Sequence, residues 1–217
     1  MITRYELART IDHSLLKPNL TYEDVKLGCE YAKENQCISV CVNANRVKFA
    51  VALLKGSETL VGTVVGFPSG AHTTSIKAKE TEEAYQDGAQ EIDMVMDIGA
   101  LKSGKYDVVK RDIIEVVKAA PATIKVILET AYLSDEEIII ASKCCEEAGA
   151  HYVKTSTGFA HEGATLKNIQ LMKNAVSNHM KIKAAGGIFT LEFSLQLLEA
   201  GCHRLGTSKT KQIFAEL

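Results

Sequence analysis

The feature that most constrains the fold is an alternation of eight short apolar runs with longer helical patterns along 217 residues. Several runs are almost continuously hydrophobic, which is typical of parallel strands that are covered on both faces. The runs are Thr10–Leu16, Ile38–Val42, Leu60–Phe67, Glu91–Ile98, Thr123–Glu129, His151–Ser156, Lys181–Gly186 and His203–Thr207. Units of about 27 residues suit a (β/α)8 barrel. We therefore predict an α/β fold, a single TIM barrel that spans residues 1–217 as one domain.

Amphipathic patterns predict helices at 73–88, 101–119 and 190–200. Two other helix starts carry capping signals, a hydroxyl residue followed three positions later by an acid, at 21–24 and 134–137. The alternative is an open, doubly wound sheet. That fold normally carries a glycine-rich GxGxxG turn after an early strand, and this sequence has none.

Composition excludes several classes of protein. The formal charge of −2 gives no electrostatic reason to expect nucleic acid as a partner. No apolar run approaches the roughly 20 residues that span a membrane, and the first residues lack the apolar core of a signal peptide. The 6 cysteines contain no CxxC pair and favour reduced thiols. We expect a cytoplasmic protein that binds a small molecule and binds neither nucleic acid nor a membrane.

Two lysines stand where core side chains are expected. Lys154 and Lys183 lie in neighbouring predicted strands, each followed by a glycine turn. A buried ammonium is costly unless it is paired or neutral, and a neutral lysine is a nucleophile for carbonyl carbon. Each lysine would also make the other easier to deprotonate. The pair indicates Schiff-base chemistry, whereas Lys181, at the start of its strand, is expected to be a solvated charge.

Other polar residues are predicted to join the lysines, because the active site of a barrel lies at the carboxyl ends of its strands. These residues are Asp12, Cys41, Asp93, Asp97, Glu129 and Ser208. Asp93 could transfer protons, directly or through water, and Asp12 could support the lysines or relay protons. Cys41 is expected in the pocket wall, and Glu129 could pair with a lysine. The histidines show no HxH or HExxH spacing, so we expect no metal and no cofactor.

Two glycine turns predict a phosphate site. Gly186-Gly187 and Gly206-Thr207-Ser208 close the last two predicted strands and precede helices. Loops after strands seven and eight commonly bind phosphate in barrels. Glycines let backbone N–H groups approach the anion, and a helix N-terminus adds a favourable dipole.

The run Lys154-Thr155-Ser156-Thr157-Gly158-Phe159 resembles the Schiff-base motif of the deoxyribose-phosphate aldolase family. The resemblance covers nearly the whole chain in order, with matching runs at 63–68, 91–95, 125–130, 183–188 and 204–208. It implies a metal-independent barrel enzyme that reversibly cleaves 2-deoxy-D-ribose 5-phosphate to acetaldehyde and D-glyceraldehyde 3-phosphate. It also implies that Lys154 forms the imine, Lys183 is the second lysine and Asp93 handles protons. Thr157 and Gly158 would contact the substrate.

The sequence departs from this family in two places. Asp97 stands where relatives often carry an uncharged residue, and we expect it to alter the electrostatics of the pocket. The sequence ends at Leu217 without the tyrosine-bearing tail of some relatives, so that role in proton transfer would fall to water or be absent. Two alternatives remain: another Schiff-base barrel, such as a transaldolase or a 2-oxo-acid aldolase, and a catalytically silent sugar-phosphate sensor. The oligomer could be a homodimer or larger.

Overall fold

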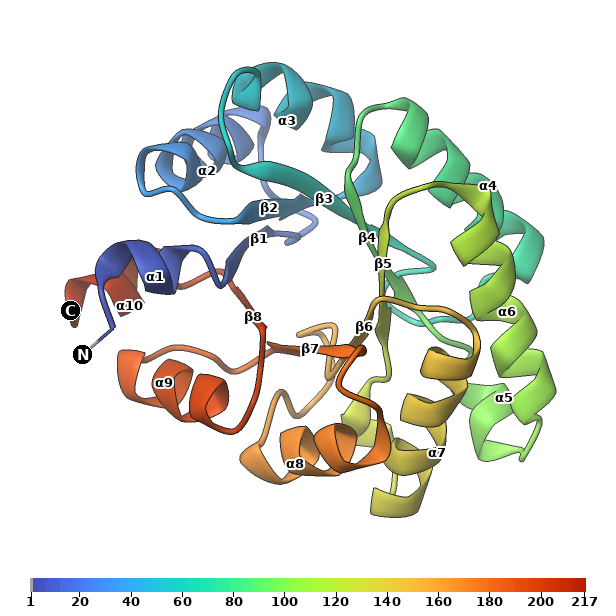
Figure 1. Ribbon diagram of the computed structural model, residues 1–217. Helices are drawn as coiled ribbons and strands as arrows, with labels where there is room; N and C mark the ends of the chain where they lie inside the picture. The colour runs from blue at the N-terminus through green and yellow to red at the C-terminus, as the bar shows by residue number, and fades with distance from the viewer. Residues whose placement is uncertain (1) are drawn as a thin grey trace.

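The computed structural model describes residues 2–217 as a closed barrel of eight parallel strands inside a ring of helices (Figure 1). Each strand pairs with the next along the chain, and the last strand pairs with the first through the register of Asp12 with Gly206. The strands are β1 (Ile11–Leu15), β2 (Ser39–Val42), β3 (Leu60–Val65), β4 (Glu91–Val95), β5 (Thr123–Ile127), β6 (Tyr152–Lys154), β7 (Lys181–Ala185) and β8 (Arg204–Thr207). The predicted TIM barrel is confirmed, and the open sheet is excluded.

Helices follow the strands and cover the outside of the barrel. They are α1 (Arg4–Ala8), α2 (Tyr22–Glu34), α3 (Val47–Leu54), α4 (Thr74–Gln86), α5 (Ile98–Lys102), α6 (Tyr106–Ala119), α7 (Asp135–Glu147), α8 (Leu166–Ala175), α9 (Leu191–Glu199) and α10 (Thr210–Ala215). Short 3-10 turns, η1 (Ala44–Arg46) and η2 (Thr130–Tyr132), follow β2 and β5. Both predicted capping boxes are present, at the starts of α2 and α7.

One helix prediction was wrong in its bounds. The segment 101–119 is not one helix, because Gly104 adopts a left-handed conformation with φ of 68° and separates α5 from α6. Asp97 accepts a hydrogen bond from the N–H of Ala100 at 2.9 Å, and this cap starts α5 three residues earlier than predicted.

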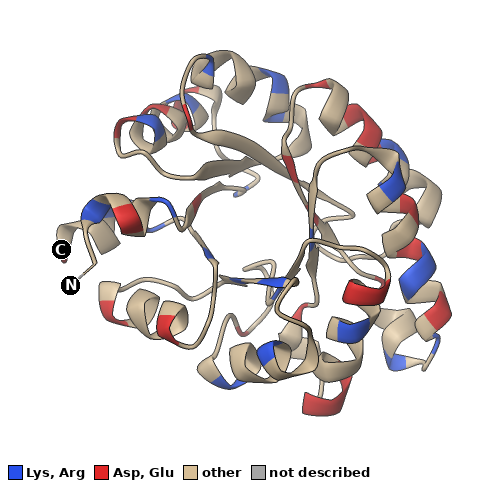
Figure 2. Cartoon of the chain, viewed as in Figure 1, with Lys and Arg blue, Asp and Glu red and all other residues tan. Residues whose placement is uncertain are grey.

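Alternate side chains along each strand point to two different regions, the layer between the strands and the helices and the centre of the barrel. In β4, Ile92 and Met94 belong to the apolar core between the strands and the outer helices. Glu91 and Asp93 point the other way and form ion pairs inside the barrel. Figure 2 accordingly shows both acidic and basic positions on the strands within the helix ring. The barrel thus has an apolar outer layer and a charged centre.

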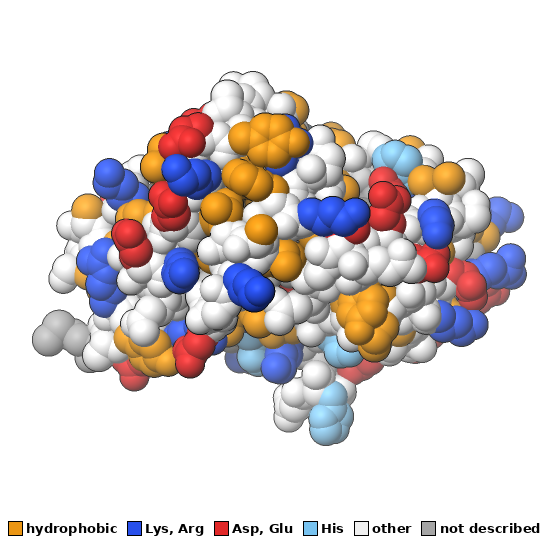
Figure 3. All heavy atoms as spheres, turned by 90° about the horizontal axis from the view of Figure 1, so that it is seen from above, with side chains coloured by type: hydrophobic (Ala, Val, Ile, Leu, Met, Phe, Trp, Pro, Cys, Tyr) orange, Lys and Arg blue, Asp and Glu red, His pale blue; other side chains and the backbone are white. Residues whose placement is uncertain are grey.

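The outer surface carries charges of both signs, interspersed over the face that Figure 3 shows. This agrees with the small net charge of −2. Within residues 2–217, no helix combines the length and apolar character that crossing a membrane requires.

Candidate active site

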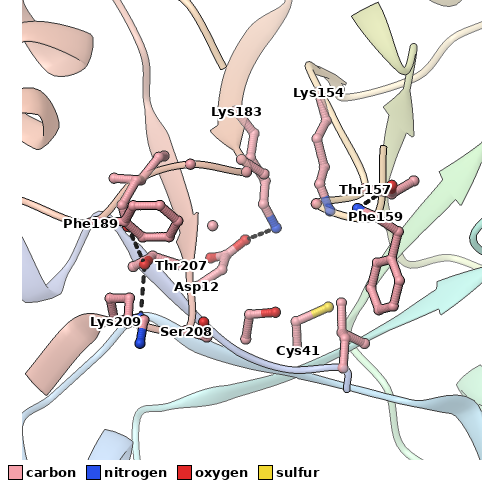
Figure 4. A pocket seen from close by; sticks show the side chains of 18 of the residues that line it. Asp12, Cys41, Lys154, Thr157, Phe159, Lys183, Phe189, Thr207, Ser208 and Lys209 are labelled. Atoms are coloured by element: carbon pink, nitrogen blue, oxygen red, sulfur yellow. Dashed lines mark hydrogen bonds and ion pairs between the residues drawn. The ribbon is translucent and has the colours of Figure 1, made fainter. Parts of the chain in front are cut away.

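A cavity of about 360 Å³ opens at the carboxyl ends of the strands, as expected for a barrel. Of the fourteen residues predicted for the site, eleven line it. They are Asp12, Cys41, Lys154, Thr157, Gly158, Lys183, Gly186, Gly187, Gly206, Thr207 and Ser208. The exceptions are Asp97 and Glu129, described below, and Asp93, which hydrogen-bonds to both lysines. Figure 4 shows Lys154 and Lys183 extending into this cavity, with Cys41 facing them.

The two lysines meet at one carboxylate oxygen. Lys154 from β6 and Lys183 from β7 each donate a hydrogen bond to Asp93 Oδ2, at 2.7 Å in both cases. Adjacent strands in register place the lysines side by side, and Asp93 comes from β4, which is separated from β6 by β5 alone. Both lysines are almost fully buried, with exposed fractions of 2% and 1%. The arrangement therefore holds two buried lysine side chains around one carboxylate.

The environment shifts the pKa values of the two lysines in opposite directions. Burial lowers the pKa of Lys154; Asp93 opposes this effect and the Lys183 ammonium reinforces it, so the pKa stays below its ordinary value. Burial also disfavours the Lys183 ammonium, but Asp12 and Asp93 outweigh burial and raise its pKa. Lys154 is therefore the lysine that loses its proton more easily.

Asp93 is held as an anion. Burial alone would raise its pKa, but Lys125, Lys154 and Lys183 outweigh burial and keep the pKa well below its usual range. Its side chain is fully buried beneath the lysines. Asp93 therefore contacts the lysines rather than the open part of the cavity.

Three further charged residues complete this cluster and were missed as site residues in the sequence. Lys125 donates hydrogen bonds to Glu91 at 2.7 Å and to Asp93 at 3.1 Å. Arg204 binds Asp12 at 2.5 Å and Glu91 at 2.8 Å. A usable signal was present, because Glu91 lies two residues before Asp93 and so faces the same side of β4.

Glu129 contacts a threonine of the lysine motif rather than a lysine. Its carboxylate accepts hydrogen bonds from the Thr157 N–H, at 3.1 Å, and from the Thr157 hydroxyl. The hydroxyl in turn accepts a hydrogen bond from the N–H of Phe159 at 3.0 Å. Burial raises the pKa of Glu129. The proposed lysine pairing is therefore wrong, and Glu129 instead fixes the turn that follows Lys154.

The Glu129 backbone is itself unusual. Its φ of 54° lies in the left-handed region, which residues with a side chain seldom adopt. This conformation occurs where the chain leaves β5 and enters η2, and it coincides with the two hydrogen bonds to Thr157. The local cost indicates that the position of this carboxylate is specified by its surroundings.

The two predicted phosphate turns lie next to each other at the cavity. Gly187 has a φ of 75°, and no atom lies within 4 Å of where a Cβ would stand. At Gly206 a Cβ would meet Lys183 Cε at 3.1 Å, so this glycine leaves room for the lysine. The Thr207 hydroxyl donates to the Ile188 carbonyl at 2.7 Å and thereby ties the two turns together. Only Ser208 keeps an exposed hydroxyl-bearing side chain here.

Aromatic and basic side chains surround the mouth and were also missed. Phe159 and Phe189 line the cavity while remaining 48% and 52% exposed. Phe159 packs edge-on against Phe67, with ring centroids 5.3 Å apart. Lys17 and Lys209 line the same cavity and are exposed.

Three remaining predictions can be located. Cys41 lies in the wall of the cavity, and burial raises the pKa of its thiol to about 11, which keeps it protonated at neutral pH. Lys181 is exposed at the start of β7, as predicted. Asp97 does not line the cavity, and its carboxylate caps α5 instead. No contact between Asp97 and the cavity therefore supports the expected change in the electrostatics of the pocket.

Comparisons with known proteins agree on one family. Residues 7–214 match the model of the DeoC/LacD family aldolases. The deoxyribose-phosphate aldolase of Staphylococcus epidermidis is 50% identical over 211 residues, which cover 97% of this chain and 96% of that protein. The solved structure of QR15, an aldolase, superposes with a TM-score of 0.93 at 42% identity, covering 97% and 95% of the two chains.

A further solved structure is the deoxyribose phosphate aldolase of Aeropyrum pernix, described as having a unique tetrameric structure. It is 27% identical, with a TM-score of 0.90, and the match covers 98% of this chain and 91% of that chain. The charged site and the full-length matches lead to one conclusion: this chain belongs to the DeoC/LacD family of aldolases and is an enzyme of the lyase class.

Proposed function

We propose that this enzyme reversibly cleaves 2-deoxy-D-ribose 5-phosphate to acetaldehyde and D-glyceraldehyde 3-phosphate, through an imine on Lys154. The observation that carries the proposal is that Lys154 and Lys183 both donate hydrogen bonds to Asp93. Of these three residues, the two lysines line the cavity and Asp93 does not. The name of the relatives supports the choice of sugar. Residues 1–217 would act as one catalytic domain.

The first step uses Lys154 as a neutral amine. Its nitrogen attacks C1 of the open-chain sugar and a C–N bond forms. The carbonyl oxygen takes up two protons, one from the amine and one from solvent, and leaves as water, which gives the protonated imine. A free lysine, with a pKa of about 10.4, is almost fully protonated at neutral pH. Burial and Lys183 lower the pKa of Lys154, which increases the fraction of reactive amine.

The second step breaks the C2–C3 bond. A base removes the proton of the C3 hydroxyl, C3 becomes the aldehyde of glyceraldehyde 3-phosphate, and the bonding electrons pass into the protonated imine. The resulting enamine takes a proton at C2, and water then releases acetaldehyde from Lys154. Asp12 and Lys183 line the cavity and can bind the hydroxyl or a water beside it. Because Asp93 does not line the cavity, a proton could reach its carboxylate from the substrate only through Lys183 or water.

The phosphate would lie against the turns at Gly186-Gly187 and Gly206-Thr207-Ser208. Open space beside Gly187 allows an anion to approach the backbone. The exposed ammonium groups of Lys17 and Lys209 add positive charge at this side of the cavity. Thr157 and Gly158 also line the cavity. Because the Thr157 hydroxyl is bound to Glu129, this turn would contact the substrate through the backbone of Gly158.

Product analysis tests this proposal. Purified enzyme is incubated with 2-deoxy-D-ribose 5-phosphate, and both products are quantified. Equal amounts of acetaldehyde and glyceraldehyde 3-phosphate are expected. Turnover only when a 2-oxo acid or a ketose donor is supplied instead would favour another Schiff-base barrel, and binding of the sugar phosphate without turnover would favour the sensor. We further expect a cytoplasmic homo-oligomer, which ultracentrifugation and cell fractionation would test.

A further inference from the structure

Six charged side chains close into a ring inside the barrel, and two of them, Asp12 and Lys183, also line the cavity. In order around the ring they are Asp93, Lys183, Asp12, Arg204, Glu91 and Lys125, so that acids and bases alternate. Each neighbouring pair is an ion pair, with N–O distances of at most 3.1 Å. Five strands contribute to the ring, and all six residues are at least 92% buried. We refer to these residues as the charge ring.

The charge ring is balanced by itself, whereas Lys154 is not. Three carboxylates face three cations within the ring, and among residues 2–217 each member contacts at least two groups of opposite charge. Lys154 lies outside the ring and contacts one carboxylate, Asp93, which the ring already uses. A protonated Lys154 therefore leaves a buried cluster with one uncompensated positive charge, and a neutral Lys154 leaves it balanced.

We infer that Arg204 and Glu91 are positioning residues that set the protonation of Lys154 through the charge balance of this ring. Neither residue lines the cavity, so neither would touch the substrate. Their influence reaches Lys154 along two arms: Arg204 through Asp12 and Lys183, and Glu91 through Lys125 and Asp93. In a buried site such charge effects are weakly screened by solvent and salt. The inference rests on the proposed imine at Lys154.

Other titratable groups near Lys154 do not supply the missing balance. Cys41 faces it from β2, but burial raises the pKa of that thiol to about 11 and keeps it neutral. Glu129, after β5, directs its carboxylate to Thr157 and forms no ion pair with Lys154. Asp93 and Lys183, from β4 and β7, are ring members. The lowered pKa of Lys154 and the raised pKa of Lys183 agree with the ring as the controlling unit.

Charge and shape can be separated by four variants. Arg204→Gln removes a positive charge, so the Lys154 ammonium becomes more favourable and its pKa rises. Glu91→Gln removes a negative charge and acts in the opposite direction. The double variant Glu91→Gln/Arg204→Gln leaves two acids and two bases in the ring and restores the balance. Arg204→Lys keeps the charge and changes only the shape.

The measurement is the pH dependence of imine formation at Lys154. The imine formed with acetaldehyde is trapped with cyanoborohydride at a series of pH values, and the adduct is located and quantified by peptide mapping. Circular dichroism confirms that each variant is folded. We expect the midpoint to rise by about one pH unit in Arg204→Gln and to fall by a similar amount in Glu91→Gln. The double variant and Arg204→Lys are expected within a few tenths of a unit of the parent enzyme.

Three outcomes would overturn the inference: an unchanged midpoint in both single variants, a shift in Arg204→Lys as large as in Arg204→Gln, or a double variant that shifts as far as Arg204→Gln. If Arg204→Gln does not fold, the downward shift in Glu91→Gln decides the matter. A parent enzyme that forms no adduct at Lys154 would contradict the proposed function itself, and the two failures are thereby distinguished.

Discussion

The ammonium of Lys183 lies 2.7 Å from Asp93 Oδ2, the same oxygen that binds Lys154. One carboxylate therefore holds the second lysine beside the proposed nucleophile. The pKa of Lys183 is raised because Asp12 and Asp93 outweigh burial, so Lys183 stays charged where its field acts on Lys154.

Replacing Lys183 by leucine should move imine formation to higher pH. Loss of this ammonium removes one of the two effects that lower the pKa of Lys154, so less neutral amine is present at a given pH. Turnover of deoxyribose 5-phosphate should fall about 100-fold or more. The measurements are the pH profile of trapping and steady-state kinetics. Lys181→Leu, which removes an exposed lysine from the same strand, should match the parent; an unshifted profile in Lys183→Leu would show that the lysines do not interact.

Replacing Thr157 by valine should weaken substrate binding and stability while leaving imine chemistry possible. The variant loses the hydroxyl that joins Glu129 to the Phe159 N–H, and it leaves a buried carboxylate without that donor. We expect a loss of about 1–3 kcal/mol in the free energy of unfolding, and a raised KM. Thr157→Ser keeps the hydroxyl and should resemble the parent. Urea unfolding and kinetics check this, and equal behaviour of the two variants would refute the role given to the hydroxyl.

Replacing Gly187 by aspartate tests the phosphate turns. A carboxylate would enter the open space beside Gly187, where the anion is expected to bind. The ratio of kcat/KM for phosphorylated over unphosphorylated deoxyribose should drop about 100-fold. Gly187→Asn adds a side chain of similar size at the same left-handed position but without the charge, and it should retain much of the ratio. Ser208→Ala should lower the ratio little. A ratio that is unchanged in a folded Gly187→Asp would place the phosphate elsewhere.

Acid should destabilise this fold through its buried carboxylates. Although burial disfavours their charge, the surrounding cations keep the pKa of both Asp12 and Asp93 below the unfolded value of about 3.9. The unfolded chain then binds more protons, so their stabilisation is present above about pH 4 and is lost as pH falls through the lower folded pKa values. Urea unfolding at a series of pH values should show this decline, with a smaller slope in Asp12→Asn. A free energy of unfolding that stays constant between about pH 6 and pH 3 would contradict the prediction.

Activity should not depend on a metal. Within the part of the chain that the structure describes, no group of three or more His, Cys, Asp or Glu side chains is arranged to hold a metal ion. Exhaustive chelation followed by the cleavage assay should leave the rate unchanged, with a metal-dependent aldolase treated in parallel as the control. Activity that is lost and returns only with a divalent ion would exclude the proposed mechanism.

Much of the site could be predicted from the sequence because strand ends in a barrel converge. Lys154, Lys183 and Asp12 each end or interrupt an apolar run, and the closed sheet brings them together. The paired hydroxyl and acid at 21–24 likewise located a helix start, since this cap depends on local sequence alone.

The charge ring was harder to predict. Arg204 is the first residue of β8, where a charge normally reaches solvent, and Lys125 lies in the middle of β5. No local pattern reveals that charged side chains from five strands pair with one another inside the barrel. The partner of Glu129 was also out of reach, because the hydrogen bonds to Thr157 depend on how the chain leaves β5 and on the path after β6. Asp97 was misjudged for the opposite reason, since its cap on α5 is local and the pattern was read as a pocket position.

Borohydride reduction in the presence of acetaldehyde, followed by peptide mapping, tests the central claim most directly. The imine on Lys154 would be reduced to a stable two-carbon adduct, so one modified peptide containing residues 154–159 is expected, and activity should be lost in proportion to it. An adduct located mainly on Lys183 or Lys181, or inactivation without any modified lysine, would contradict the assignment of Lys154 as the nucleophile.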